Sequence, residues 1–240
     1  MKVGSIIFSR ISSNRLPGKA LIDISGKTLL SRVIERAKKI KSIDHICVAT
    51  SVNSEDDIIE KVSKLHGVDV FRGDLNDVTQ RAIDAARYFR YTSFLRLCAD
   101  RPFFDGNIYD DLIFNHKKNK YDLTTNIFPR SVPPGLTGEV VSLEALEKCI
   151  LMTEDIFDRE HVTRFIYNNP SKFSIQNIKY FNDKDIIDLR LVVDNEVDLK
   201  RAIWIAEKIG KAKDDFPTKE IIQLAKKWKT ENKISLNNKL

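Results

Sequence analysis

The stretch VGSIIFSRISSNRLPGK, residues 3–19, joins a short apolar run to a polar loop that carries three cations. Val3 to Phe8 is apolar and β-branched, as is typical of a buried strand, and the loop from Ser9 to Lys19 follows it directly. In sheets of parallel strands, ligands bind beyond the carboxyl ends of the strands. We therefore predict that this loop belongs to a ligand site.

The rest of the first half repeats the order strand, loop, helix. Apolar side chains recur at helical spacing in some segments, and short apolar runs lie between them. Ser54 is expected to be the N-cap of the second helix. Strands that alternate with helices imply right-handed crossovers and a mainly parallel central sheet covered on both faces, so we predict a three-layer α/β/α fold. The predicted helices span residues 29–37, 58–65 and 77–89, and the predicted strands span 43–50, 68–71 and 93–97.

The order of elements is less regular after Asp105. A proline-rich loop over residues 129–138 precedes a strand-like run from Glu139 to Ser142. We predict a single domain over residues 1–229 and a flexible basic tail over 230–240. Further helices are predicted at 108–118, 143–152, 159–168, 197–209 and 218–229, and extended segments are predicted at 173–178 and 189–193.

Composition limits the class of protein. The 240 residues are 42% hydrophobic, which suits one α/β core and is too little for two substantial domains. Cys47, Cys98 and Cys149 are widely spaced and fit neither a disulfide framework nor a CxxC metal site, so we expect buried free thiols. Because we find neither a signal-peptide pattern nor an apolar run of membrane-spanning length, we expect a cytoplasmic protein without membrane insertion.

The formal charge of +6 raises the question of nucleic-acid binding. Part of the excess lies in the Lys-rich stretch 226–239, which has almost no aromatic side chains. Such a stretch would give only weak, salt-sensitive association with a polynucleotide. We therefore expect an anionic small molecule as the partner, and no nucleic acid.

The loop after the first strand has the chemistry that a triphosphate requires. It places the cations Arg10, Arg15 and Lys19 among the hydroxyl groups of Ser9 and Ser13. Guanidinium, ammonium and hydroxyl groups, together with backbone N–H groups, supply convergent donors and offset several negative charges. The alternative is a solvated basic turn, but the position at a strand end favours a binding role.

The segment RISSNRLPGKAL resembles the signature RxxSxRLPGKxL of the cytidylyltransferases that activate acidic sugars, which include the CMP-Kdo and CMP-sialic acid synthetases. The chain is similar in particular to the family of spore coat polysaccharide biosynthesis protein F. This resemblance covers nearly the whole chain, through VATSVNSEDD, VFRGDLNDV, ADRPFFD, GLTGEVVSLEALEK, FDREHVT and LRLVVDNEVDL. It implies a nucleotide-diphospho-sugar transferase (GT-A-like) fold, CTP and a sugar or sugar-acid acceptor as substrates, and a homodimer.

The resemblance also implies a metal site at Asp100 and Asp194. Mg²⁺ is the expected ion, and Mn²⁺ would fit as well. The sequence agrees, because Asp100 follows the strand that ends at Leu97 and Asp194 follows the extended segment 189–193, and carboxylates are hard oxygen ligands. Each aspartate has a simpler alternative, since Asp also caps helices and forms turns.

The expected catalytic residues are Lys19, Arg10 and Asp100. Lys19 and Arg15 are predicted to contact the β- and γ-phosphates, and Arg10 is predicted to contact the α-phosphate. By resemblance, three further arginines border the nucleotide, although each of them could instead form a surface ion pair. These are Arg72, Arg81 and Arg96.

The acceptor side is predicted from the segments GLTGEV and DREHVT. His161 could assist proton transfer, but a lone helical His is more often structural. Pro134 and Thr137 stand where relatives have acidic residues, which leaves the identity of the acceptor open. A metal-dependent glycosyltransferase and a non-catalytic nucleotide-binding subunit remain as alternative functions. The acceptor-binding candidates are Glu139, Asp158, Arg159 and His161.

Overall fold

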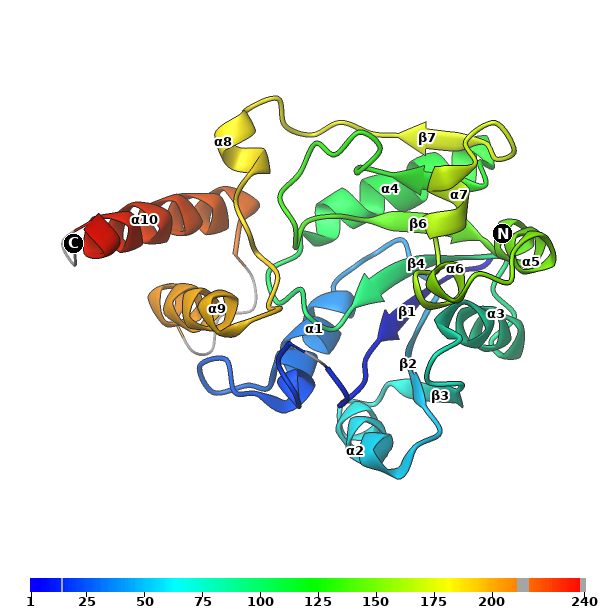
Figure 1. Cartoon of the computed structure of the whole chain (residues 1–240), viewed down its shortest axis with the longest axis horizontal. Helices are drawn as coiled ribbons and strands as arrows, with labels where there is room; N and C mark the ends of the chain where they lie inside the picture. Colours follow the sequence, from blue (N-terminus) through cyan, green and yellow to red (C-terminus); the bar gives the residue numbers. More distant parts are fainter. Residues whose placement is uncertain (14, 211–215, 238–240) are drawn as a thin grey trace.

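A computed structural model describes residues 1–13, 15–210 and 216–237. Within these residues, seven strands form one sheet in the order β3-β2-β1-β4-β6-β5-β7 (Figure 1). The strands β3, β2, β1 and β4 are parallel, β6 runs antiparallel to its neighbours β4 and β5, and β7 is parallel to β5. The sheet is thus mainly parallel, as predicted. The strands are β1 (Val3–Phe8), β2 (His45–Ser51), β3 (Asp69–Gly73), β4 (Ser93–Cys98), β5 (Leu123–Thr125), β6 (Glu139–Ser142) and β7 (Ile175–Asn177).

Helices cover both faces of the sheet and form the outer layers. Ile7 of β1 packs with α1 (Leu29–Ala37), α2 (Asp57–Leu65) and α4 (Gly106–Asn119) in one buried cluster. Ile6 points to the opposite face, because successive side chains of a strand alternate. There it joins a second cluster that includes α3 (Val78–Tyr88), α5 (Leu143–Met152) and α7 (Arg164–Asn168). The predicted three-layer fold is confirmed.

The last helices form a third hydrophobic cluster beside the sheet. In this cluster α9 (Glu196–Ile209) packs against α10 (Thr218–Asn237), and Figure 1 shows the two helices next to each other at one side of the molecule. The final helix was predicted to end at residue 229, but it continues to Asn237. Positions 230–237 of the predicted tail are therefore helical, and positions 238–240 lie outside the described residues.

Side-chain caps explain where several helices begin. Thr28 accepts the backbone N–H of Ser31 at the start of α1, and Asp77 accepts that of Gln80 at the start of α3. Ser142 caps α5 in the same way. The predicted cap Ser54 is wrong, because Ser54 begins the short 3-10 helix η2 (Ser54–Asp56) and α2 follows from Asp57.

Two predicted elements of the second half differ in the structure. The helix predicted over 159–168 is two short helices, α6 (Ile156–Glu160) and α7, because Asp155 caps a start at Ile156 and the chain turns between them. The segment 189–193 is buried apart from Arg190 and is not a strand. Its hydrogen bonds go to irregular loops instead, with Leu191 N donating to Pro134 O and Val193 N donating to Asp100 O. Strand β5 was not predicted.

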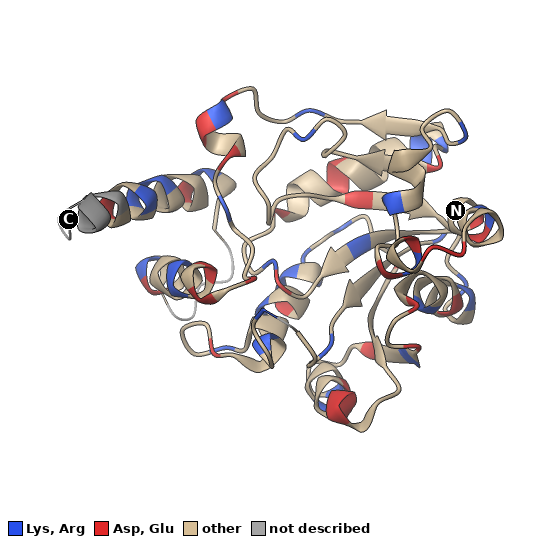
Figure 2. Cartoon of the chain, in the orientation of Figure 1, with Lys and Arg blue, Asp and Glu red and all other residues tan. Residues whose placement is uncertain are grey.

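The environments of the cysteines agree in part with the expectations from composition. Cys47 and Cys149 are buried free thiols, but Cys98 is only half-buried because it lies at the open end of β4. No helix in the described part of the chain has the length and apolar character needed to cross a bilayer. Figure 2 shows basic and acidic residues interspersed along α9 and α10.

Candidate active site

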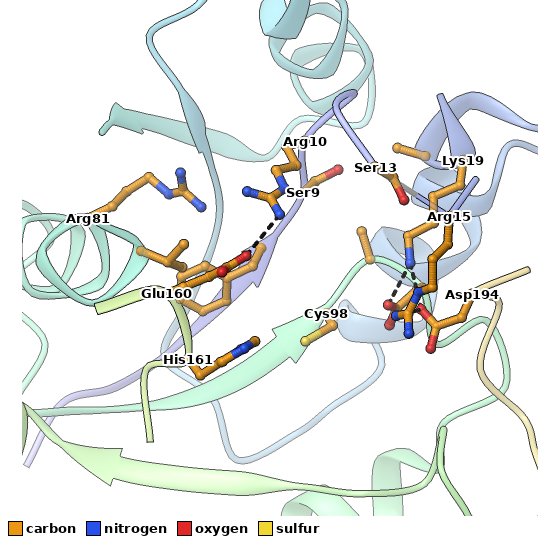
Figure 3. A pocket seen from close by; sticks show the side chains of 15 residues that line it. Ser9, Arg10, Ser13, Arg15, Lys19, Arg81, Cys98, Glu160, His161 and Asp194 are labelled. Carbon is orange, nitrogen blue, oxygen red and sulfur yellow. Dashed lines mark hydrogen bonds and ion pairs between the residues drawn. The ribbon is translucent and has the colours of Figure 1, made fainter. Parts of the chain in front are cut away.

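A pocket of about 500 Å³ lies at the carboxyl ends of β1 and β4. The first loop forms one side of this pocket, α3 and the end of α6 form another, and the turns after β4 and before α9 complete it (Figure 3). It is therefore at the edge of the sheet where the sequence predicted a ligand site. Its lining consists of Phe8, Ser9, Arg10, Ser13, Arg15, Lys19, Ala20, Val78, Arg81, Cys98, Ala99, Asp100, Glu160, His161 and Asp194.

The first loop is closed on itself and anchored to the sheet. Gly18 N donates to Ile11 O at 3.0 Å, and Gly18 has a φ of 68°, a left-handed conformation that glycine adopts without strain. This turn leads directly into Lys19, the first residue of the 3-10 helix η1 (Lys19–Leu21). At the other end of the loop, Ile11 N donates to Asp56 Oδ1 at 2.7 Å. The backbone that carries Lys19 is thus fixed at both ends.

Asp56 is the anchor of this loop, and the sequence did not reveal it. It is fully buried, and its carboxylate also accepts the backbone N–H and the hydroxyl of Ser51. Burial would raise the pKa of Asp56, but the hydrogen bonds from Ser51 and Ile11 lower it by more. The pKa therefore lies below its usual value. The charged carboxylate therefore ties the first loop to the end of β2.

Two carboxylates converge at the other side of the pocket. Val193 N donates to Asp100 O at 2.9 Å, which brings the segment before α9 against the turn after β4. As a result, both aspartate side chains reach the same point. Lys19 Nζ donates to Asp100 Oδ2 at 2.8 Å, to Asp194 Oδ1 at 3.0 Å and to Val193 O at 3.1 Å. The predicted pairing of Asp100 with Asp194 is present in the structure.

Lys19 is a charged group in this setting. Burial lowers its pKa, but the charge of Asp100 and the hydrogen bonds to Asp100 and Asp194 raise it, and the net pKa is above the usual value for lysine. Arg15 also reaches this cluster and pairs with Asp194 Oδ1 at 3.0 Å. Arg190, which was not predicted, approaches Asp194 Oδ2 at 3.7 Å. Cations from two parts of the chain therefore surround the two carboxylates.

The oxygen atoms around Lys19 Nζ fit a divalent cation. Two carboxylates and one backbone carbonyl lie within 3.1 Å of the ammonium nitrogen. Mg²⁺ prefers hard oxygen ligands and is commonly bound by one or two carboxylates together with substrate phosphates. Among the described residues, no three His, Cys, Asp or Glu side chains form a metal centre. Asp100 and Asp194 could thus hold Mg²⁺ or Mn²⁺ with the remaining ligands supplied by a substrate.

The opposite side of the pocket is dominated by two arginines. Arg10 Nη2 pairs with Glu160 Oε1 at 3.2 Å, while the buried Arg81 donates to Asp74 O at 2.6 Å. Burial lowers the pKa of Arg81 to about 10, and the nearby charge of Arg10 acts in the same direction. Arg81 Nε and Ser9 Oγ have no hydrogen-bond partner among the described residues. An anionic ligand would satisfy these groups and relieve the repulsion between the arginines.

Arg72 lies outside the pocket lining. Its guanidinium donates to Asp57 Oδ1 at 2.6 Å and to Glu60 Oε2 at 3.0 Å, both on α2. It also donates to the carbonyl oxygens of Ser51 and Asn53. These contacts join β3 to α2. Arg72 thus forms the ion pairs that were considered as the alternative to nucleotide binding.

Arg96 and the buried Glu139 form an ion pair that is also outside the lining. Arg96 Nη1 donates to Glu139 Oε2 at 2.6 Å, and Glu139 Oε1 accepts the hydroxyls of Thr163 at 2.6 Å and Tyr167 at 2.9 Å. Burial would raise the pKa of Glu139, but the charge of Arg96 and the bond from Thr163 hold it below its usual value. This cluster joins β4, β6 and α7.

The remaining acceptor candidates lie on or next to α6. Asp158 accepts Arg164 Nη1 at 2.5 Å and Thr153 Oγ1 at 2.9 Å, and Arg159 pairs with Asp77 at 3.3 Å. Neither side chain lines the pocket, and both hold α6 in place. His161 is exposed and lines the pocket.

Of the predicted site residues, the structure brings nine into the pocket and leaves five outside it. Most of the residues missed in the lining have apolar or small side chains, at the ends of β1 and β4, on η1 and at the start of α3. Glu160 is the missed charged residue, although it stands next to His161 in the predicted acceptor segment. Those inside are Ser9, Arg10, Ser13, Arg15, Lys19, Arg81, Asp100, His161 and Asp194, and those outside are Arg72, Arg96, Glu139, Asp158 and Arg159.

Comparisons with known proteins concern the family and the fold. A sequence model of the cytidylyltransferase family matches residues 5–233. The spore coat polysaccharide biosynthesis protein SpsF of Bacillus subtilis is 30% identical over 225 residues, which cover 91% of this chain and 92% of SpsF. A cytidylyltransferase structure from Leptospira borgpetersenii superposes with a TM-score of 0.89 at 30% identity and covers 96% of both chains. A CTP complex of CMP:2-keto-3-deoxy-manno-octonic acid synthetase has the same fold, with a TM-score of 0.68, 15% identity, and 87% of this chain and 99% of that chain covered.

Proposed function

We propose that this chain, a nucleotidyltransferase that belongs to the cytidylyltransferase family, transfers CMP from CTP to a sugar acid or a sugar phosphate and releases pyrophosphate. The product would be a nucleotide sugar for the synthesis of a surface polysaccharide or glycoconjugate. Support for this role comes from SpsF, whose name refers to spore coat polysaccharide biosynthesis, and from the synthetase that shares the fold. The name of SpsF suggests a role in polysaccharide synthesis, and the name of the synthetase suggests a CMP-activated sugar.

The convergence of Lys19, Asp100 and Asp194 in one pocket is the observation that carries this proposal. The ammonium of Lys19 lies within 3.0 Å of both carboxylates, and the guanidinium of Arg15 lies 3.0 Å from Asp194. A triphosphate needs cations along its β- and γ-phosphates, and these two residues can supply them. Arg10 on the opposite side can reach the α-phosphate.

The proposed reaction is an in-line displacement at the α-phosphorus. A hydroxyl or phosphate oxygen of the acceptor forms a bond to this phosphorus, and the bond from the phosphorus to the bridging oxygen of the β-phosphate breaks. Pyrophosphate leaves with the bonding electrons, and a hydroxyl acceptor loses its proton. The residues of the pocket contribute position and charge: Lys19 and Arg15 stabilise the leaving pyrophosphate, and Arg10 stabilises charge at the α-phosphate.

Asp100 and Asp194 would hold Mg²⁺, or Mn²⁺ in its place, which neutralises phosphate charge when bound. The acceptor would enter beside His161, which is exposed at the pocket and could receive the proton of an acceptor hydroxyl. We also propose a homodimer, by analogy with the family.

Pyrophosphate release tests this function. The assay would combine Mg²⁺ and each of the four nucleoside triphosphates with a panel of ulosonic acids, nonulosonic acids and sugar 1-phosphates. We expect release with CTP and one class of acceptor, and we expect its loss in Lys19→Ala and Asp100→Ala. The acceptor that works also decides whether a hydroxyl or a phosphate oxygen attacks.

Lys64→Ala is a matched control, because Lys64 is an exposed lysine that pairs with Glu60 on α2 and does not line the pocket. Its activity should equal that of the unmodified protein. If no triphosphate supports release while a nucleotide sugar is cleaved or transferred, the protein is a glycosyltransferase. Binding of CTP without any turnover would favour a non-catalytic subunit.

A further inference from the structure

The carboxylates that are proposed to hold a metal ion already have cations of the protein as partners. Lys19 Nζ lies between Asp100 Oδ2 and Asp194 Oδ1, and it also donates to Val193 O. Arg15 pairs with the same Asp194 oxygen (Figure 3). The ammonium thus lies at the point where the oxygen ligands converge, so a divalent cation and Lys19 cannot occupy this point together.

The charges of this cluster balance in pairs. Lys19 and Arg15 carry two positive charges, and Asp100 and Asp194 carry two negative charges. A divalent cation alone would displace Lys19 and leave two cations of the first loop without anionic partners. A triphosphate alone would draw the same cations away and leave Asp100 without Lys19 and Asp194 with only the more distant Arg190, both beside the ligand. When both arrive, the carboxylates pair with the divalent cation and the loop cations pair with the phosphates.

We propose that Lys19 and Arg15 occupy the metal carboxylates in the free protein and exchange onto the triphosphate when it binds with a divalent cation. This inference rests on the proposed function and adds an order of binding to it. The protein binds the metal ion and the triphosphate together and binds either one alone weakly. Lys19 therefore couples the two ligands, in addition to its contact with phosphate.

The surrounding structure allows this exchange without rearrangement of the backbone. The loop is closed by the bond from Gly18 N to Ile11 O and is anchored at Asp56. The side chain of Lys19 has four rotatable methylene groups beyond this fixed backbone. Arg15 is more mobile in principle, because 71% of its side chain is exposed. Rotation of two side chains inside one pocket is therefore sufficient.

Direct measurement of metal binding tests the exchange independently of turnover. Mn²⁺ binding would be followed by the electron paramagnetic resonance signal of free Mn²⁺, with and without CTP and with no acceptor present, and the Mn²⁺ that CTP binds without protein would be measured and subtracted. We expect CTP to tighten Mn²⁺ binding to the unmodified protein by about 30-fold, within the usual range of coupling between two sites. In Lys19→Met, Mn²⁺ alone should bind about tenfold more tightly than to the unmodified protein, and the coupling should shrink.

Two further variants separate this effect from a general loss of structure. Lys19→Arg keeps the positive charge and should keep the weak binding of Mn²⁺ alone. Lys64→Met removes a lysine from the ion pair with Glu60 on α2 and should leave both the Mn²⁺ affinity and the coupling unchanged. Circular dichroism and thermal unfolding would establish that each variant is folded.

Failure of the exchange is distinguishable from failure of the proposed function. Equal or weaker binding of Mn²⁺ alone to Lys19→Met, or Mn²⁺ binding to the unmodified protein that does not respond to CTP, overturns the exchange even if pyrophosphate is released. The exchange is supported if Mn²⁺ alone binds more tightly to Lys19→Met and if CTP tightens Mn²⁺ binding to the unmodified protein. If these binding results were obtained but the unmodified protein released no pyrophosphate with any acceptor, the proposed reaction would be at fault.

Discussion

Two charged clusters lie along β4. They differ in the burial of their carboxylates and in whether hydroxyl groups also bind those carboxylates. At the end of the strand, Lys19, Asp100 and Asp194 are partly exposed in a pocket, with 17–20% of each side chain accessible. Within the strand, Arg96 is 19% accessible, but its partner Glu139 is only 2% accessible and also accepts two hydroxyls. The first cluster lines the pocket and is open to a ligand, whereas the second lies outside the lining. We therefore propose that the same pairing of a cation with a carboxylate serves binding in one place and stability in the other.

The largest effect should come from Asp100→Asn in the pocket cluster. We expect the kcat/KM of pyrophosphate release to fall about 10³-fold, because the substitution removes a carboxylate charge that is proposed to hold the metal ion at the reacting phosphates. The free energy of unfolding should change by only about 1 kcal/mol, because the ion pair is accessible to solvent and Lys19 keeps Asp194. Steady-state kinetics and urea unfolding would measure the two quantities. Retained activity would remove Asp100 from the catalytic residues.

Glu139→Gln should show the opposite pattern. The substitution removes the carboxylate partner of Arg96, and Arg96 is only 19% exposed, so we expect the free energy of unfolding to fall by about 3 kcal/mol, the lower end of the range for a buried pair. Glu147→Gln is the matched control, since Glu147 pairs with Arg87 on the surface and its loss should cost less than about 1 kcal/mol. Equal effects of both substitutions in urea unfolding would contradict the contrast between the clusters.

The effect of Glu139→Gln should depend on pH. The pKa of Glu139 is lower in the folded protein than its usual value of 4.5, so the folded state favours the charged form. The stability that this charge contributes is complete above pH 4.5 and is lost as the pH falls through the lower folded pKa. The difference in unfolding free energy between the unmodified protein and Glu139→Gln should therefore narrow as the pH falls below 4.5. A difference that stays constant would mean that the charge of Glu139 does not cause it.

Asp198 connects the pocket to the buried interior and should have an intermediate effect. It is almost fully buried, accepts the backbone N–H of Asp194 at 3.1 Å and pairs with Arg190 and Arg201. Because it orients Asp194, we expect Asp198→Asn to weaken Mn²⁺ binding about 10–100-fold, the range for residues that support metal ligands. Asp183→Asn, at an exposed ion pair with Lys226, is the control. Unchanged Mn²⁺ affinity in folded Asp198→Asn would assign it to stability alone.

The sequence predicted the pocket cluster better than the buried cluster for a physical reason. Loop residues after a parallel strand must lie at one edge of the sheet, so Lys19 and Asp100 could be placed there from local pattern. The family inferred from the segment RISSNRLPGKAL was confirmed. The partners of Glu139 depend on tertiary packing of α7 against β6, which local pattern does not reveal.

The errors in predicted elements have a related cause. The segment 189–193 has the composition of a strand, but its hydrogen bonds go to Pro134 and Asp100 in irregular loops. The bond from Val193 to Asp100 is also the contact that joins the two carboxylates. Asp56 has the local pattern of an ordinary residue near a helix start, yet tertiary contacts make it the anchor of the first loop. Long-range hydrogen bonds therefore decide the parts of the site that the sequence left open.

The smallest effect should be that of Arg72→Gln, which sharpens the distinction between arginines inside and outside the pocket. Arg72 is held by Asp57 and Glu60, so its loss should cost about 1 kcal/mol of stability and change the Kd of CTP by less than about twofold. Arg81→Gln removes a buried cation that lines the pocket and should raise this Kd about tenfold or more, as expected for a charged hydrogen bond. Calorimetric titration of both variants with CTP and Mg²⁺ measures the difference. A larger effect of Arg72→Gln would mean that Arg72 leaves α2 and joins the nucleotide when it binds, as the family resemblance predicts.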